Sequence, residues 1–422
     1  MSSIPPSPLA PPPTRPEPPR LPGPLTVARQ LYKDWFGKDV QETPTVSYVW
    51  TADQFGHFSL GFTITYLFSW IARWYFGDPN VPGWAFAACG GANMLMWIVK
   101  EVLDYKREYA NYRAAHLNAA DQPIPGVAQF PFNGHEIWWN VITALIYFAT
   151  GIITATMALY DPLWGVEAAG AVFVMTLGVG YWWVRRKITF QQAGLPYLYR
   201  FANFPKKIEV VPNPELRGTE ESAVQYLTEF STPLPADFNG PAEHIIIFGA
   251  AGVGKSSLAT AVGTEHAFQM GVGRYTTLSK ILEFEQKKAL DARAHMRLKV
   301  ERGGDVTNEE QQEFFDGRIL WPWDRSPLLI IDDVDDLFGF DATAEGTVEE
   351  RGRKVVERIE ARVPGVVAKL KLVRRTIWVL SDRLQGKEYT KLLRSLFDVD
   401  TSRIHVIKVS QIVGPSVPEG QA

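Results

Sequence analysis

The stretch HIIIFGAAGVGKSSL, residues 244–258, decides the fold of the second half of this chain. It reads as a short β-branched strand, a glycine-rich loop and the start of a helix, and it matches the pattern G-x-x-x-x-G-K-[ST]. Glycines in such a loop let successive backbone N–H groups face one phosphate, and the following helix adds its positive N-terminal end. We therefore expect this loop to bind a nucleotide phosphate.

The residue types of the loop predict individual roles. Lys255 should reach the β- and γ-phosphates of ATP, and the Ser256 hydroxyl should ligate Mg²⁺. ATP and Mg²⁺ are therefore the expected cofactors. The predicted nucleotide-binding residues are Gly249, Ala250, Ala251, Gly252, Val253, Gly254, Lys255, Ser256 and Ser257.

Two further strands end in polar residues. Residues 327–333, PLLIIDD, form an apolar strand that ends in two carboxylates. As a parallel neighbour of the phosphate-loop strand, it would place Asp332 beside the Mg²⁺ shell, with Asp333 as the group that orients or deprotonates the attacking water. The strand at residues 376–380 ends in Ser381, which could sense the γ-phosphate or serve a structural purpose. The predicted catalytic residues are thus Asp333, Lys255 and Ser381, with Arg394 or Arg403 as the open choice of an arginine finger.

Four apolar runs occupy the first half of the chain. About 20 apolar residues cross a hydrocarbon core of roughly 30 Å. We expect a bundle of transmembrane helices at residues 54–76, 82–99, 137–160 and 166–184. The predicted domains are a Pro-rich disordered cytoplasmic tail and pre-membrane segment (1–45), a transmembrane domain (46–187), a connector (188–240) and a three-layer α/β P-loop domain with a mainly parallel sheet (241–422).

Basic residues predict the orientation of the helices. Arg29 and Lys33 precede the first run, Lys106 follows the second and Arg185 follows the fourth, whereas residues 161–165 contain no base. Loops on the cytoplasmic side are rich in Lys and Arg. We therefore expect a multi-pass protein of the plasma (inner) membrane with both termini in the cytoplasm.

Composition excludes several classes of protein. The net charge of −3 creates no global field for a nucleic acid, so no nucleic-acid partner is expected. The one cysteine, Cys89, excludes an intramolecular disulfide and a Cys-based zinc site. Residues 1–24 are rich in proline and lack the apolar core of a signal peptide.

Residues 245–282 and 328–382 resemble the AAA+ ATPases of the replication-initiator, helicase-loader and transposition-helper group. The phosphate-loop residues Gly249, Gly252, Gly254, Lys255 and Ser256 carry the resemblance, together with Asp332. The resemblance implies ATPase activity with ATP and Mg²⁺, and homo-oligomers. No firm resemblance to a family covers the membrane half.

This chain departs from that group at two points. Asp333 stands where the group has Glu, which implies slow turnover or a switch held by its nucleotide; STAND signalling NTPases, similar in Gly-Val-Gly-Lys and Asp-Asp-Val, work in that way. The short sequence after the strand at residues 403–409 leaves no room for the helical lid of a full AAA+ module.

Ionisable residues gather where the predicted helices meet the cytoplasmic boundary. Carboxylates and imidazoles that face a bundle interior can hold a divalent metal or bind an anionic head group. The alternative is that they are interfacial caps and solvated loop charges. The candidate membrane-face residues are Asp53, His57, Glu101, Asp104, His135 and Glu136.

Three functions remain open on this evidence. The leading one is a membrane-anchored ATPase or nucleotide switch that couples ATP binding or hydrolysis to the membrane helices, with the lipid bilayer and an unidentified protein as partners. The second is an oligomeric channel, transporter or effector gated by its nucleotidase domain. The third is a membrane metal enzyme that acts on lipid phosphates through the membrane-face residues.

Overall fold

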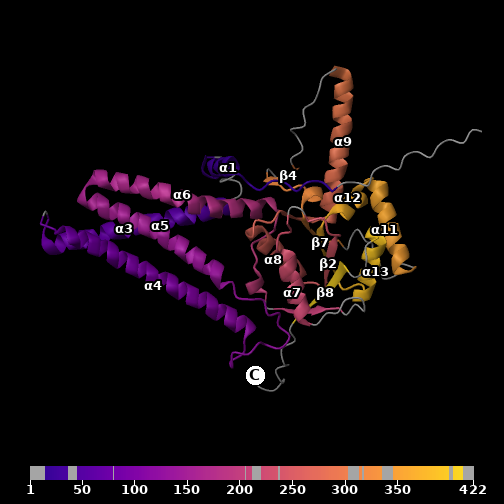
Figure 1. Cartoon of the computed structure of the whole chain (residues 1–422), viewed down its shortest axis with the longest axis horizontal. Coiled ribbons are helices and arrows are strands. Elements are labelled where there is room, and N and C mark those ends of the chain that lie inside the picture. The colour runs from indigo at the N-terminus through magenta and orange to yellow at the C-terminus, as the bar shows by residue number, and fades with distance from the viewer. Residues whose placement is uncertain are drawn as a thin grey trace, which may run out of the picture.

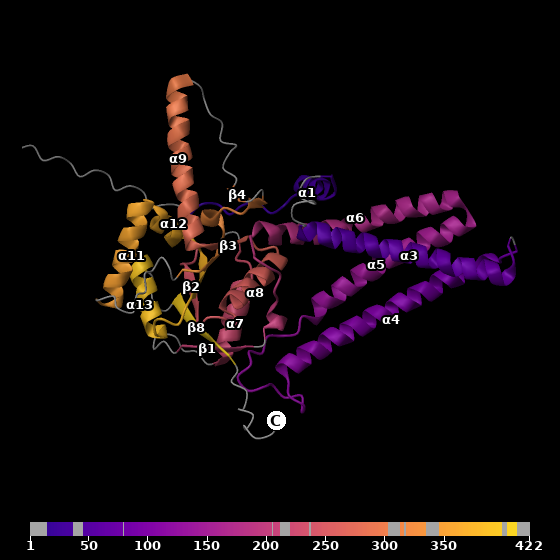
Figure 2. The ribbon, with the colours of Figure 1, turned by 180° about the vertical axis from the view of Figure 1, so that it is seen from behind.

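The computed structural model describes residues 15–36, 45–78, 80–204, 206–211, 220–235, 238–302, 313–315, 318–334, 346–398 and 403–411, so residues 1–14 of the predicted tail lie outside the described residues. Figure 1 shows a bundle of long helices beside an α/β unit, with helix α6 running from one into the other. The same arrangement is seen from behind in Figure 2.

Four long helices pack together in the first half of the chain: α3 (Val46–Phe76), α4 (Gly83–His116), α5 (Gly134–Tyr160) and α6 (Pro162–Gln192). By length and composition α4, α5 and α6 are able to cross a membrane, whereas α3, predicted as the crossing at 54–76, does not reach that hydropathy. Its Thr, Ser, Tyr and Trp side chains add polar atoms to an otherwise apolar run. The predicted crossing at 82–99 is the first half of the much longer α4.

The polarity of this bundle is opposite to that of a water-soluble protein. Large apolar side chains point outward: Trp74 is 81% exposed and Met175 77%. Inside, the fully buried Asn93 donates to the Gly61 carbonyl oxygen (2.8 Å) and to Thr65 Oγ1 (3.0 Å). Polar groups that bond between helices and apolar groups that face outward are typical of helices surrounded by lipid.

Glycines bring α3 and α5 into backbone contact. A Cβ atom at Gly151 would overlap the Phe58 carbonyl oxygen, and one at Gly61 would overlap the Phe148 carbonyl oxygen. Small residues let two helices approach closely and gain van der Waals contact, which is the main source of association between helices in lipid. The two glycines therefore fix where α3 crosses α5.

The α/β unit is built on a six-stranded sheet in the order β1-β8-β2-β7-β6-β3. Only the β1–β8 pair is antiparallel. The strands are β1 (Lys207–Val210), β8 (Ile404–Ser410), β2 (Glu243–Phe248), β7 (Arg375–Leu380), β6 (Leu328–Asp332) and β3 (Gly273–Thr277). A separate hairpin pairs β4 (Glu313–Phe315) with β5 (Arg318–Leu320).

Helices cover both faces of this sheet, which gives the predicted three layers. Ile245 and Ile247 of β2 pack into one apolar layer, and Ile246 and Phe248 pack into the other. Because both faces are buried, the central strands are apolar throughout instead of alternating. The helices of the first layer are α7 (Glu220–Ser231) and α8 (Lys255–Phe268); those of the second are α9 (Leu278–Arg302), α11 (Val348–Arg362), α12 (Val366–Leu372) and α13 (Gly386–Phe397).

One prediction about the sheet is wrong. The strand that ends at Asp332, β6, is not a neighbour of the phosphate-loop strand β2, because β7 lies between them and pairs with both. The order of strands depends on which helices cover each one, and the apolar patterns of β6 and β7 are too similar to tell them apart.

Gly151→Ala should lower the free energy of unfolding of the bundle in detergent micelles by about 1–3 kcal/mol, because the added methyl group forces α3 and α5 apart. Denaturant titration of the full chain measures it. The control is Gly170→Ala in α6, where a Cβ atom meets nothing within 4 Å. Equal effects of the two substitutions would contradict the assigned helix contact.

Candidate nucleotide site and its connection to the helix bundle

The phosphate loop joins β2 to α8 through six residues whose glycines the backbone requires. Gly252 (φ +76°) and Gly254 (φ +99°) adopt left-handed conformations that favour glycine. At Gly249 (φ +156°) a Cβ atom would overlap the Val409 carbonyl oxygen of β8. The glycine pattern that predicted the loop thus has a separate steric cause at each position.

The first turn of α8 presents its backbone N–H groups without a competing cap. Gly254 is the N-cap residue, it provides no side-chain cap, and the turn contains no acidic residue. Such an end carries a partial positive charge and attracts anions. Lys255 Nζ donates to the Ala250 carbonyl oxygen (2.8 Å), so the lysine lies over the loop, and Ser256 lies half-buried in the same turn. Ser257 Oγ lies 2.9 Å from Tyr197 Oη of the connector.

The carboxyl ends of β2, β7 and β6 meet at one edge of the sheet. Phe248 pairs with Leu380, so Ser381 follows β7 at the level of Gly249. Ile331 pairs with Trp378, so Asp332 at the end of β6 lies two residues before the level of Ser381. Neighbouring strands are about 4.8 Å apart, so β6 lies roughly 10 Å from β2. Asp332 is therefore offset from the phosphate loop by one strand, with the start of the Ser381 segment between them. Tyr389 Oη donates to the Ser381 carbonyl oxygen.

Tyr275, which the sequence pattern did not indicate, holds the Asp332 carboxylate. It lies opposite Ile330 in the β3–β6 register, so Asp332 is its diagonal neighbour on the same face. Tyr275 Oη donates to Asp332 Oδ2, and the Asp333 backbone N–H donates to Asp332 Oδ1 (2.8 Å). Burial raises the pKa of Tyr275, and Asp332 raises it further, so the phenol stays protonated and remains a donor.

Asp333 adopts a left-handed backbone conformation with φ +53°. Asp and Asn tolerate this region better than other non-glycine residues. Its side chain is exposed beyond the end of β6. Asp is therefore one of the residue types that this backbone conformation accommodates.

An ionic network joins the bundle to α8, and it includes one of the predicted membrane-face residues. Glu136, at the start of α5, accepts from Arg186 Nη2 (2.7 Å) and Arg200 Nη1 (2.6 Å). Arg200 Nε also donates to Glu265 of α8 (2.6 Å). Burial raises the pKa of Glu136, but Arg200 and Arg186 outweigh it and hold the pKa below its usual value. The sequence could not show this network, because its members are far apart along the chain.

The remaining membrane-face residues separate into two places. His57 Nε2 lies 3.7 Å from Asp53 Oδ1, and Lys100 Nζ lies 2.8 Å from both the Glu101 and Asp104 carboxylates. His135 is elsewhere and accepts from Trp139 Nε1 (3.1 Å). Among the described residues there is no group of three or more His, Cys, Asp or Glu that could hold a metal ion. Lys100 thus pairs with two of the acids that the predicted metal site required.

The two candidate finger arginines lie on the α13–β8 side of the sheet. Arg394 is in the last turn of α13, and Arg403 precedes β8. Among the described residues, neither makes a hydrogen bond or an ion pair with the phosphate loop. An arginine finger acts across a subunit interface, so either would act on a neighbouring copy.

Comparison with known proteins gives limited similarity. No family model and no curated protein matches the chain. A crystal structure of the DnaC helicase loader aligns with 52% of this chain and 98% of its own, at 13% identity and a TM-score of 0.25. A crystal structure of DnaI aligns with 47% of this chain and 84% of its own, at 13% identity and a TM-score of 0.22. Because both scores are low, the function proposed below rests on the geometry of this chain.

The residues at this edge of the sheet suit a nucleotide and its Mg²⁺. Lys255 and the N–H groups of the loop would hold phosphates, and Ser256 and Asp332 are oxygen ligands of the kind that Mg²⁺ takes in phosphate sites. Tyr275 and the Asp333 N–H group fix the Asp332 carboxylate from behind, as outer-shell partners do at metal sites.

Tyr275→Phe should raise the Mg²⁺ concentration needed for half-maximal ATP binding by about tenfold, because it removes the donor that orients Asp332. Fluorescent-nucleotide titrations at several Mg²⁺ concentrations measure this. Tyr199→Phe is the control, since it removes a hydroxyl that donates to the Asn203 carbonyl oxygen (2.5 Å) instead. If Tyr275→Phe instead lowered the Mg²⁺ concentration needed for half-maximal ATP binding, the phenol would be competing with the metal and not positioning its ligand.

Proposed function

We propose that this chain is a membrane-anchored ATP-binding protein, a Mg²⁺-dependent ATPase or nucleotide switch whose nucleotide state is coupled to the helix bundle. One observation carries the proposal. Helix α6 runs without a break from its apolar part into the α/β unit, and the Ala193 carbonyl oxygen at its end accepts from the Tyr275 backbone N–H (2.7 Å). The side chain of the same Tyr275 donates to Asp332. Two hydrogen bonds, both made by Tyr275, thus connect the predicted Mg²⁺ ligand Asp332 to the end of α6, a candidate membrane helix.

A second contact supports the coupling from the opposite end of the site. Arg200 bridges Glu136 of α5 and Glu265 of α8, the helix that begins at Lys255. A shift of α8 on nucleotide binding would therefore act on α5 through charged hydrogen bonds, which are about twice as strong as neutral ones. Gln192 adds a backbone contact, since its carbonyl oxygen accepts from the Trp321 N–H (2.8 Å).

The predicted AAA+ likeness and the topology belong to the same proposal. The glycine loop, the Asp332 strand and the mainly parallel sheet support an AAA+-like P-loop domain that assembles into homo-oligomers. Three helices, α4, α5 and α6, are apolar and long enough to cross a membrane. The proposal takes α3 as the fourth crossing, because both termini lie on one side only when the number of crossings is even. The bases Arg185 and Arg186, where α6 enters the α/β unit, favour a cytoplasmic location for that unit and for both termini.

The other functions receive less support. Because α3 and α5 touch at Gly61 and Gly151, a pore would have to form between several chains instead of within one bundle. Lys100 already pairs with both Glu101 and Asp104, and no cluster of metal-ligating side chains is found among the described residues. We therefore do not extend the proposal to a channel or to a metal enzyme.

Lys255→Ala should reduce Mg²⁺-dependent ATP binding by the full chain at least about a hundredfold, because it removes the cation that faces the β- and γ-phosphates. Binding and phosphate release are measured in nanodiscs. Lys354→Ala, at an exposed position of α11, is the control. Binding without turnover in the wild type would favour a switch; unchanged binding in Lys255→Ala would overturn the nucleotide assignment.

Arg200→Lys should separate nucleotide binding from its effect on the bundle, because lysine cannot bridge Glu136 and Glu265 with the planar fork of arginine. Hydrogen exchange with and without ATP measures the effect. In the wild type we expect ATP to change protection at residues 134–140; in Arg200→Lys the change should fall at least about threefold while ATP affinity stays within about twofold. Arg358→Lys on exposed α11 is the control. An undiminished response at residues 134–140 would contradict coupling through Arg200.

A further inference from the structure

The helix before the bundle, α1 (Pro24–Phe36), has three different faces. One face docks on the protein, one exposes apolar side chains and one exposes bases. Positions on a helix recur every 3.6 residues, so residues three, four or seven apart share a face. The docked face contains Val27, Leu31 and Asp34; the apolar face contains Leu25, Ala28, Tyr32, Trp35 and Phe36; the basic face contains Arg29 and Lys33.

The docked face holds α1 firmly against the start of α3 and the end of α6. Val27 is 3% exposed and packs in a cluster with Trp50 and Trp183. Asp34, which is fully buried, accepts from Thr45 Oγ1 (2.6 Å) and Ser47 Oγ (2.5 Å). The apolar face is therefore held in place by packing on another side of the helix.

The apolar face is large and faces away from the protein. Leu25 is 64% exposed, Tyr32 67% and Phe36 78%. Arg29 and Lys33 lie directly beside it along the helix. Apolar side chains next to a row of bases are typical of a helix that lies in the interface of an anionic bilayer.

The position and direction of α1 suit this interpretation. Its partner Trp50 lies just before the apolar run of α3, and its partner Trp183 lies at the end of the apolar run of α6, next to the bases Arg185 and Arg186. In Figure 1 and Figure 2, α1 is seen end-on while α3 to α6 run lengthwise, so it lies crosswise to the bundle. A helix crosswise to the spans and level with their ends lies in the plane of the membrane surface.

The exposed face of α1 also continues into the outer face of the bundle. The ring of Trp35 lies 6.3 Å from that of Phe55, and Phe55 lies 6.3 Å from Phe58. From there Phe58 and Phe62 (6.3 Å) carry the row along α3. The lipid that would cover α3 would thus cover α1 as well.

We infer that α1 is an interfacial helix that inserts its apolar face into the cytoplasmic leaflet and binds anionic phospholipid headgroups through Arg29 and Lys33; the inference rests on the membrane part of the proposed function.

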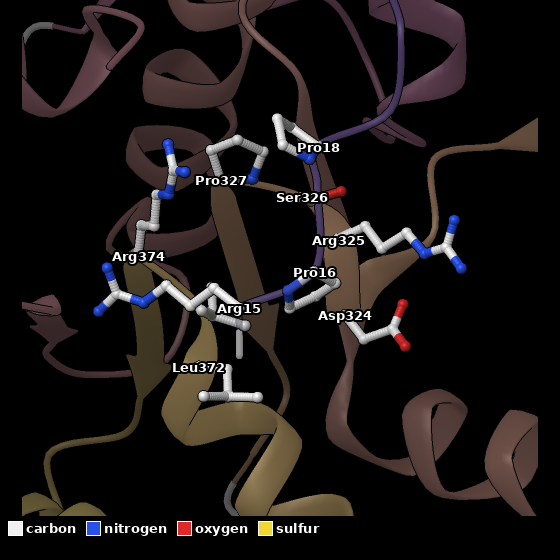
Figure 3. A pocket seen from close by; sticks show the side chains of 10 residues that line it. Arg15, Pro16, Pro18, Asp324, Arg325, Ser326, Pro327, Leu372 and Arg374 are labelled. Carbon is white, nitrogen blue, oxygen red and sulfur yellow. The ribbon is translucent and has the colours of Figure 1, made fainter. Parts of the chain in front are cut away.

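A strap, residues 15–23, connects this helix to the α/β unit. Arg15 Nη1 donates to the Gly240 carbonyl oxygen (2.8 Å). Figure 3 shows Pro16 and Pro18 in a shallow hollow between residues 324–327 and 372–374, where β6 and β7 begin. That is the edge of the sheet opposite to the phosphate loop, so lipid binding at α1 would act on the sheet from the side away from the nucleotide.

The test places one fluorophore at a time on the full chain in vesicles. In a Cys89→Ser background, Tyr32→Cys and Leu25→Cys carry an NBD label on the apolar face, and Thr26→Cys carries it on the basic face. Nitroxide-labelled phospholipid should quench positions 32 and 25 at least about threefold more than position 26, and aqueous iodide should show the reverse order. Leu95→Cys, at a 62% exposed position of α4, reports on the bundle itself.

The outcomes separate the inference from the proposed function. Lipid quenching at position 95 without quenching at 32 or 25 overturns the interfacial helix alone, and no lipid quenching at position 95 overturns the membrane assignment. Shielding at position 32 that depends on protein density and not on nitroxide lipid would mean that a second copy covers this face, which also overturns the inference.

The charge requirement is tested in the same vesicles. Replacing phosphatidylcholine by a mixture with phosphatidylglycerol should increase lipid quenching at position 32, and Arg29→Glu with Lys33→Glu should cancel the increase, since each base near an anionic surface changes binding by about fivefold. Lys354→Glu with Arg358→Glu at exposed positions of α11 is the control, because it changes the net charge by the same amount and sign. Equal quenching in both lipids would contradict the binding of anionic headgroups by Arg29 and Lys33.

Discussion

The hydrogen bond from the Tyr275 N–H to the Ala193 carbonyl oxygen is the contact on which the relation between the two halves depends. It joins Ala193, the residue directly after the 31-residue helix α6, to β3, an edge strand of the sheet. An edge strand presents unpaired N–H and C=O groups that need a cover. Here the cover is the end of α6, so the position of the bundle and the position of β3 are set together. Because β3 also carries the phenol that holds Asp332, the predicted Mg²⁺ side of the site is built on the same contact.

The phosphate loop could be predicted from the sequence, whereas the order of the strands that carry the rest of the site could not. A glycine loop between a strand and a helix is encoded by neighbours in the chain, and positive φ at Gly252 and Gly254 needs only those residues. The separation of β2 from β6 by β7 depends on pairing between residues far apart along the chain, such as Glu243 with Arg375 and Leu328 with Arg375. Similarly, Glu136 looked like part of an acidic cluster because its neighbours on the helix end are polar. Its actual partner, Arg200, lies 64 residues further on, and no periodic pattern indicates such a pair.

The Asp332–Asp333 pair shows how backbone and side chain constrain each other. The Asp333 N–H donates to the carboxylate before it, and the conformation that allows this has φ +53°. A residue in that region is easier to accommodate when its side chain is short and polar. An Asp at position 333 therefore suits the turn that directs its backbone N–H group at the Asp332 carboxylate.

At least three connections of different kinds hold the α/β unit to the helix bundle and α1. Helix α6 provides a continuous backbone, Arg200 provides charged hydrogen bonds between α5 and α8, and the strap from α1 reaches the far edge of the sheet. A single flexible linker would let the unit rotate freely, whereas three separate attachments restrict it to motions that strain none of them. The attachments meet the α/β unit at β3, at α8 and, on the edge opposite to the phosphate loop, at the starts of β6 and β7. Under the proposed function, a movement of α8 relative to β6 on nucleotide binding would be passed to the helices through these attachments.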